Sequence, residues 1–172
     1  MGAALREVFL TFGAVTAATL ALSWAGRFEP LAVAAVVFPP FVLGFYLFHR
    51  PTHAFSLQLP DSLASYALTQ LLVVALPEEA LFRGYIQGRL GEPFTRRVRV
   101  LGAELSPAAV SIQALLFALI HFAVDLHPYR LAVFFPALAF AWLRERRGGI
   151  GAPAAFHALC NLFSDVLVRS WL

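Results

Sequence analysis

The sequence predicts an all-α fold, a polytopic transmembrane helical bundle of about six spans that forms a single membrane domain over residues 1–172. Of the 172 residues, 60% are apolar and only 13% are charged, whereas an average soluble domain is about 45–50% apolar and about 25% charged. A helix that crosses a bilayer needs roughly 20 apolar residues, so six spans use about 120 residues. A disordered chain and a soluble globular domain are therefore both disfavoured.

Apolar runs, turn residues and charges divide the chain into six expected spans. Ser62 and the pair Ser106 and Pro107 are favourable helix starts, because serine caps a helix N-terminus and proline is tolerated at its first position. The most polar stretch, residues 91–106, is expected to be a loop. The spans are expected at about residues 8–25, 31–48, 62–90, 107–124, 131–143 and 153–172.

The charges predict an orientation in the membrane. All thirteen basic residues are arginine, and the formal net charge is +3. Eight arginines fall on one side of the expected bilayer and four on the other, and the positive-inside rule assigns the richer side to the cytoplasm. Arginines scattered over loops form no nucleic-acid-binding face, so we expect no nucleic-acid partner. We expect an integral protein of a bacterial inner (cytoplasmic) membrane, surrounded by the lipid bilayer.

Ionisable residues inside the apolar runs are the candidates for function, because a charged side chain is costly in a bilayer. The third expected span contains Glu78 and Glu79, and Arg83 follows Glu79 by four positions. Residues four apart share a helix face, so Glu79 and Arg83 are expected to pair while Glu78 is turned about 100° away. A structural pair that locks two helices together would explain Glu79 but not the second glutamate.

Two later spans each carry a histidine with a partner four positions away. Phe117 and His121 lie on one face of the fourth span, and His157 and Asn161 lie on one face of the sixth. Taken singly, a core histidine and an interhelical hydrogen bond would explain these residues equally well.

Together, the three sites contain the groups needed to activate water. A glutamate can act as general base, one histidine can position the water, and a second histidine with an asparagine can donate hydrogen bonds to an oxyanion. The same glutamate and histidines, Glu78, His121 and His157, could instead bind a divalent metal such as zinc. The spacing alone does not choose between these two chemistries.

The three motifs, in this order, resemble those of the CAAX protease and bacteriocin-processing enzyme family, also called the CPBP or Abi family or the type II CAAX prenyl endopeptidases. The family pattern is Glu-Glu-x-x-x-Arg, then Phe-x-x-x-His, then His-x-x-x-Asn or Asp. No motif position is substituted in this chain, and the resemblance covers about residues 62–168. The matching residues are Glu78, Glu79, Arg83, Phe117, His121, His157 and Asn161.

The resemblance implies a glutamic-type intramembrane endopeptidase that cleaves a membrane-anchored protein or peptide substrate near its terminus. Carried over to this chain, Glu78 is the general base and His121 helps to hold the water. His157 and Asn161 then form the oxyanion hole, and Glu79 and Arg83 support them. This interpretation requires no cofactor, and a divalent metal such as zinc is the alternative.

Two other classes of function remain compatible with the sequence. A proton- or metal-coupled carrier would use the same buried glutamate and histidines as a relay. A non-catalytic membrane chaperone or immunity factor would need none of the motif residues for its effect.

Helix rise gives an expectation for the depth of each site residue in the membrane. At 1.5 Å per residue, Glu78 lies about 24 Å along the third span, near the cytoplasmic side. His121 lies about 21 Å into the fourth span from the cytoplasm, nearer the opposite side. The expected spans therefore place these two residues at different depths.

Overall fold

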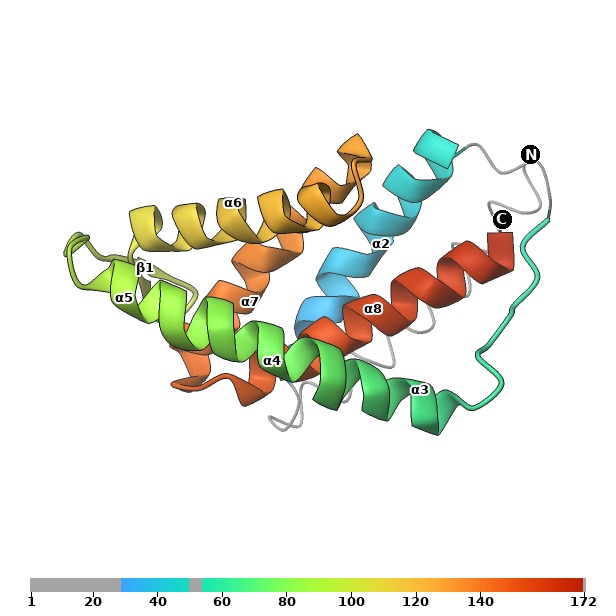
Figure 1. Cartoon of the computed structure of the whole chain (residues 1–172), viewed down its shortest axis with the longest axis horizontal. Coiled ribbons are helices and arrows are strands. Elements are labelled where there is room, and N and C mark those ends of the chain that lie inside the picture. Colours follow the sequence, from blue (N-terminus) through green and yellow to red (C-terminus); the bar gives the residue numbers. More distant parts are fainter. Residues whose placement is uncertain (1–28, 50–53, 172) are drawn as a thin grey trace. The chain divides into compact units, whose positions relative to one another are not determined.

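The computed structural model of the chain describes residues 29–49 and 54–171, and the expected first span over residues 8–25 lies outside these ranges. The described part is mostly helical, with one small β-hairpin (Figure 1). The elements are α2 (Glu29–His49), α3 (Leu63–Thr69), η1 (Gln70–Ala75), α4 (Leu76–Glu79), η2 (Ala80–Ile86), α5 (Gln87–Gly91), β1 (Val98–Val100), β2 (Ala103–Leu105), α6 (Pro107–Val124), η3 (Pro128–Val133), α7 (Phe134–Arg147) and α8 (Gly151–Trp171).

The third expected span is one continuous helical stretch, built from α3, η1, α4, η2 and α5 in succession. Its helical start after Ser62 agrees with the prediction, and the Ser62 carbonyl accepts a hydrogen bond from the amide of Tyr66 over 2.9 Å. The stretches η1 and η2 are π-helical and lie on either side of α4, which contains Pro77. Proline lacks an amide N–H and its ring crowds the preceding turn, which gives a local reason for widened turns here.

Contacts within the chain define two compact units, one of which covers residues 71–157. In this unit η2 and α5 pack against α6, and α6 packs against α7 (Figure 1). Alanines with 0–1% exposure on α6 and α7 allow the helix backbones to approach closely, and phenylalanines fill the remaining space. The buried residues of these two helices include Ala114, Phe117, Ala118, Ala137, Phe140, Ala141 and Leu143.

The predicted start of the fourth span at Pro107 is confirmed, and its physical basis is a serine cap. The Ser106 hydroxyl accepts a hydrogen bond from the amide of Ala109 over 3.4 Å and donates one to the Phe94 carbonyl over 3.0 Å. Proline at the first helical position loses no hydrogen bond, because that amide has no partner within the helix.

Part of the expected loop over residues 91–106 is an antiparallel β-hairpin. Strand β1 pairs with β2 in the register Val98 to Leu105, Arg99 to Glu104 and Val100 to Ala103. The connecting residues Leu101 and Gly102 have φ of 45° and 81°, and two positive φ values characterise the tight turn whose twist suits a hairpin.

Side chains of α7 hold this hairpin in place. The indole nitrogen of Trp142 donates to the Val100 carbonyl over 3.0 Å, and Arg146 donates to the Gly102 carbonyl over 3.4 Å. The hairpin is therefore a docked part of this unit.

The short connection after α6 is closed by an ion pair outside the apolar helices. Arg130 Nε donates to the Asp125 carboxylate over 2.7 Å, and this hydrogen bond holds the pKa of the Asp125 carboxyl below its usual range. The expected fifth span over residues 131–143 is in fact the 3₁₀ turn η3 followed by α7, which begins at Phe134 and continues to Arg147.

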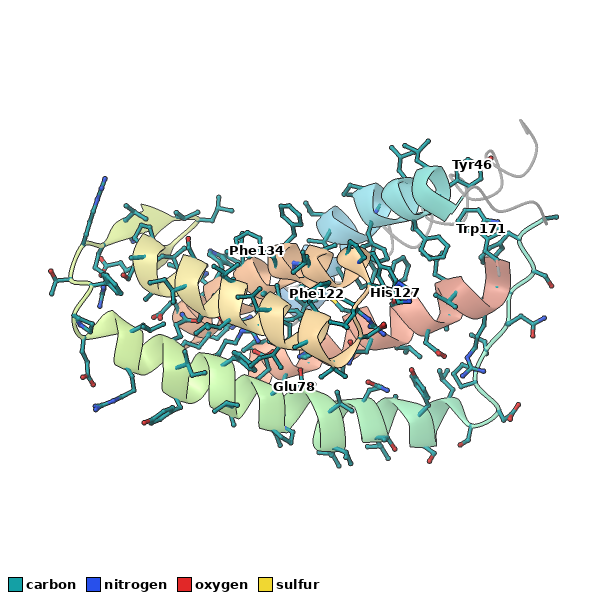
Figure 2. All side chains as sticks on the ribbon, turned by 45° about the horizontal axis from the view of Figure 1, so that its top comes forward. Tyr46, Glu78, Phe122, His127, Phe134 and Trp171 are labelled. Carbon is teal, nitrogen blue, oxygen red and sulfur yellow. The ribbon has the colours of Figure 1, made fainter. Side chains whose placement is uncertain are left out.

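The second unit comprises residues 1–70 and 158–172, of which the structure describes 29–49, 54–70 and 158–171. Its core joins α2 to the last turns of α8 through Val42, Leu167 and Trp171, which are 2–4% exposed. The rings of Tyr46 and Trp171 lie 5.3 Å apart between centroids (Figure 2). The segment before α3 is attached at the same place, since the amide of Ser56 donates to the Ser170 carbonyl over 3.1 Å.

Large apolar side chains cover much of the outer surface of the helices, which suits lipid rather than water. Two described helices are long and apolar enough to cross a bilayer, Pro107–Val124 and Gly151–Trp171, and a shorter apolar stretch covers Val33–Leu47. The all-α class agrees with the prediction, whereas six spans are not confirmed. Exposed apolar residues include Leu68, Leu72, Val73, Leu81, Leu115, Leu119, Ile120 and Val124.

The substitution Gly102→Ala tests the hairpin turn. Because an alanine at φ of 81° is strained, and its Cβ would lie 2.6 Å from Arg146 Nη1, we expect a loss of about 1–2 kcal/mol of unfolding free energy. Gly149→Ala is the matched control, since its Cβ would meet nothing within 4 Å. Denaturant unfolding of the detergent-solubilised protein measures both, and equal stability of the two variants would contradict the proposed strain.

Candidate active site

A buried ion pair joins the two charged residues that the sequence places four positions apart. Arg83 Nη1 donates to Glu79 Oε1 over 2.9 Å, and both side chains are fully buried. The predicted pairing of Glu79 with Arg83 is therefore confirmed. A desolvated pair of this kind is stable only when its remaining polar atoms also find partners.

Neighbouring helices supply partners for part of the Arg83 guanidinium, while Arg83 Nε and Glu79 Oε2 have no hydrogen-bond partner among the described residues. Its guanidinium carbon lies 4.4 Å from the ring centroid of Phe117 and 4.8 Å from that of Phe140. Its Nη2 group also donates to the Ala137 carbonyl over 3.3 Å. Aromatic faces attract a cation most strongly where water is excluded, so α6 and α7 both help to hold this charge.

The same Glu79 oxygen fixes His157. The ring nitrogen Nδ1 of His157 lies 2.9 Å from Glu79 Oε1, and the ring stacks on Phe140 at 4.8 Å between centroids with 17° between the planes. An ionised carboxylate only accepts hydrogen bonds, so Nδ1 carries the proton and donates it. The other ring nitrogen, Nε2, therefore faces away from Glu79.

Glu78 faces two imidazoles and is only one-third exposed. Its Oε2 atom lies 3.8 Å from Nε2 of His157 and 4.0 Å from Nε2 of His121. Oε2 is buried and has no hydrogen-bond partner among the described residues. Figure 2 shows the Glu78 side chain on the side of its helix that faces α6. These separations are too long for direct hydrogen bonds but suit one bridging water.

The orientation of His121 follows from its own helix. Its Nδ1 atom lies 2.9 Å from the Phe117 carbonyl, one turn earlier in α6. A carbonyl only accepts, so Nδ1 carries a proton and Nε2 of the neutral ring is an acceptor. When both rings are neutral, three acceptors, Glu78 Oε2 and the two Nε2 atoms, converge with no donor among them.

The depth expectation for His121 is wrong, and the helix bounds explain why. Glu78 lies 13 residues before the end of α5 at Gly91, and His121 lies 14 residues after the start of α6 at Pro107. At 1.5 Å per residue these distances are about 20 and 21 Å. Measured from the end of α5 and the start of α6, which face the same side of the membrane in the expected topology, Glu78 and His121 lie at the same depth. The expectation fails because it counts Glu78 from the far end of its long helix.

Asn161 lies one turn after His157 in α8, in the unit that comprises residues 1–70 and 158–172. Its Nδ2 group donates to Gln70 Oε1 over 2.8 Å. One of its two amide hydrogens is thereby used, and the second is available to another acceptor.

Three residues with hydrogen bonds or ring contacts in the described part of the chain do not follow from the sequence motifs. Phe140 belongs to no motif, and only its apolar character marks it as a core residue. Gln70 and Gln87 are glutamines in an apolar stretch. Such polar residues often form hydrogen bonds between helices, so their position in the sequence could have identified them.

The geometry of the cluster bears on whether it can be a metal centre. The donor set suits zinc, because both imidazoles present Nε2 while Nδ1 donates to an acceptor, as metal-binding histidines do. Ligand atoms about 2.0 Å from a tetrahedral zinc lie roughly 3.3 Å apart, which is closer than the 3.8 and 4.0 Å found here. In the described part of the chain, no group of three or more His, Cys, Asp or Glu side chains is placed to hold a metal ion.

A helical protein with apolar outer surfaces and a buried carboxylate–imidazole cluster belongs to the class of helical integral membrane proteins. A family model described as type II CAAX prenyl endopeptidase Rce1-like matches residues 60–163, well over half of the chain. The chain belongs to this family of membrane peptidases, as its motifs predict. No curated protein and no solved structure gives a match.

The substitution Arg83→Met tests the buried pair. It leaves Glu79 buried without its cation, so we expect a loss of about 3–5 kcal/mol of unfolding free energy. Arg89→Gln is the matched control, because the pair of Arg89 with Glu92 is largely exposed and its loss costs about 1 kcal/mol or less. Unfolding in detergent measures both variants. Equal losses would show that the buried pair contributes no more than a surface pair.

Proposed function

We propose that this protein is an intramembrane endopeptidase that hydrolyses a peptide bond near the terminus of a membrane-anchored substrate, with water activated by Glu78. The observation that carries the proposal is the convergence of three polar atoms, Glu78 Oε2 and the Nε2 atoms of His121 and His157, at separations of 3.8 and 4.0 Å from Oε2. A water molecule donates its two hydrogens to Glu78 Oε2 and His121 Nε2 and keeps a lone pair for attack on a carbonyl carbon.

Charge counting supports one further proton in this cluster. Two ionised carboxylates, Glu78 and Glu79, and one guanidinium, Arg83, leave a net charge of −1. A buried cluster is most stable when its charges balance, so one additional proton or cation belongs there. We assign the proton to Nε2 of His157, where the charge of the ring lies against the Glu79 carboxylate that accepts from its Nδ1.

In the proposed reaction, the water held by Glu78 and His121 attacks the carbonyl carbon while its proton passes to the Glu78 carboxylate. The new C–O bond gives a tetrahedral oxyanion, which accepts hydrogen bonds from His157 Nε2 and the second Nδ2 hydrogen of Asn161. The proton on Glu78 then moves to the amide nitrogen as the C–N bond breaks. The products are a carboxyl terminus and an amine, and Glu78 is restored.

The remaining motif residues position these groups. Glu79 sets which nitrogen of His157 faces the substrate, and Arg83 holds Glu79 in place. The family match to a peptidase favours this reaction over the carrier and the non-catalytic chaperone or immunity factor. We retain the expectation of a bacterial inner membrane as part of the proposal.

The substitution Glu78→Gln tests the general base. It keeps the size of the side chain but removes the proton acceptor, so we expect cleavage to fall by about 10²–10⁴-fold. Glu104→Gln, at an exposed glutamate, is the matched control and is expected to retain activity. Mass spectrometry of membrane-protein termini in cells that carry each variant measures the outcome, with circular dichroism of the purified variants as the test of folding. A folded Glu78→Gln variant that produces the wild-type termini would exclude Glu78 as the base.

Treatment with a chelator tests the choice between water held by side chains and water held by a metal. We expect 1,10-phenanthroline to leave cleavage by the purified protein unchanged. Loss of cleavage that added zinc restores would instead assign Glu78, His121 and His157 as metal ligands. Elemental analysis of the purified protein would then show about one zinc per chain.

A further inference from the structure

A polar cavity of about 380 Å³ lies further along the helix that carries Glu78, between the ends of α5, α6 and α7. It is lined by two cations, Arg97 and Arg144, and two anions, Glu92 and Glu145, together with Gln87. All of these residues belong to the unit of residues 71–157. The proposed reaction uses none of them.

The two arginines retain donors for a ligand. Arg97 donates from Nη1 and Nη2 to the carbonyls of Phe94 and Gly91, with the second hydrogen bond at 3.0 Å, and contacts no carboxylate in the described part of the chain. Arg144 donates from Nη1 to Glu145. A guanidinium has five N–H donors, so each arginine has further donors for an anion.

Gln87, in contrast to the two arginines, offers the ligand a hydrogen-bond acceptor. Its side chain is 3% exposed, and its amide nitrogen donates to the Ala141 carbonyl over 3.4 Å and to Glu145 Oε1 over 2.9 Å. Both partners only accept, which fixes the orientation of the amide. Gln87 Oε1 is a buried acceptor with no partner in the described residues. A ligand that satisfies this atom must carry an N–H or O–H donor beside its anionic group.

The expected end of the third span near residue 90 puts the cavity at the expected level of lipid headgroups. Gln87 precedes the end of α5 by four residues, which is about 6 Å of helix, and the headgroup region of one leaflet is roughly 5–7 Å deep. Most of the arginines of the chain belong to α5, the hairpin segment and the end of α7, including Arg89, Arg96, Arg99, Arg146 and Arg147. Basic pockets between transmembrane helices at this level bind lipid headgroups.

We propose that this cavity binds the phosphate headgroup of a membrane lipid whose headgroup also carries a hydrogen-bond donor, as phosphoethanolamine does. Arg97 and Arg144 contact the phosphate oxygens. The ammonium group donates to Gln87 Oε1 and lies beside the Glu145 carboxylate. The site does not depend on the peptidase reaction, so its test is independent of the test of the proposed function.

Native mass spectrometry of the full chain in detergent tests this site with phosphatidylethanolamine and with phosphatidylcholine of the same acyl length. Choline has the same phosphate but no N–H, so we expect wild-type protein to bind phosphatidylethanolamine about tenfold more tightly. Arg97→Gln is expected to weaken its binding about tenfold. Arg99→Gln removes the same charge from the neighbouring strand, outside the cavity, and is expected to bind as wild type does.

Two results would overturn the site: equal affinity for the two lipids, or an Arg97→Gln variant that binds phosphatidylethanolamine as well as Arg99→Gln does. Inorganic phosphate and O-phosphoethanolamine distinguish a lipid from a soluble ligand. Weak binding of both supports a lipid, because a lipid is held by its acyl chains on the apolar helices as well as by the cavity. Binding of either as tightly as phosphatidylethanolamine would assign the cavity to a soluble anion and overturn the lipid proposal.

Discussion

One carboxylate oxygen determines the arrangement of the polar cluster. Glu79 Oε1 accepts hydrogen bonds from both Arg83 and His157, each over 2.9 Å. Arg83 in turn donates to the Ala137 carbonyl of α7 and lies over the Phe117 ring of α6. Groups from η2, α6, α7 and α8 are therefore arranged, directly or through Arg83, around one buried charge. Because water is excluded here, removal of Glu79 or Arg83 leaves the other charge unpaired, so the cluster is held as a unit.

The adjacent glutamates lie in different environments because a helix turns by about 100° per residue. Glu79 points into the packed interior and is fully buried, while Glu78 is 33% exposed and directs Oε2 toward two imidazole nitrogens. A proton acceptor for catalysis needs access to a substrate, whereas a supporting group needs exclusion from water. In the proposed reaction, one dipeptide on a helix satisfies both requirements.

The sequence predicts those features that depend on residues close together in the chain. The start of α6 follows from Ser106 and Pro107, and the Glu79–Arg83 pair follows from a spacing of four. The hairpin does not follow, because its strands are three residues long and its Leu-Gly turn is a weak signal. Phe140 and Gln70 escape prediction because their partners come from distant parts of the sequence. The depth of His121 depends on the full length of the preceding helix, which no local pattern specifies.

The position of the polar cavity on the helix of Glu78 has a consequence for how the protein is held in the membrane. Gln87 lies nine residues after Glu78, about 14 Å along a helix. A headgroup bound at Gln87 would fix the depth of this helix in the leaflet, and with it the depth of Glu78 below the lipid surface. Hydrophobic matching alone fixes depth poorly, because each ångström of mismatch costs little. A headgroup site at one end of the helix would thus set how far a membrane-anchored substrate must enter to reach the Glu78 carboxylate.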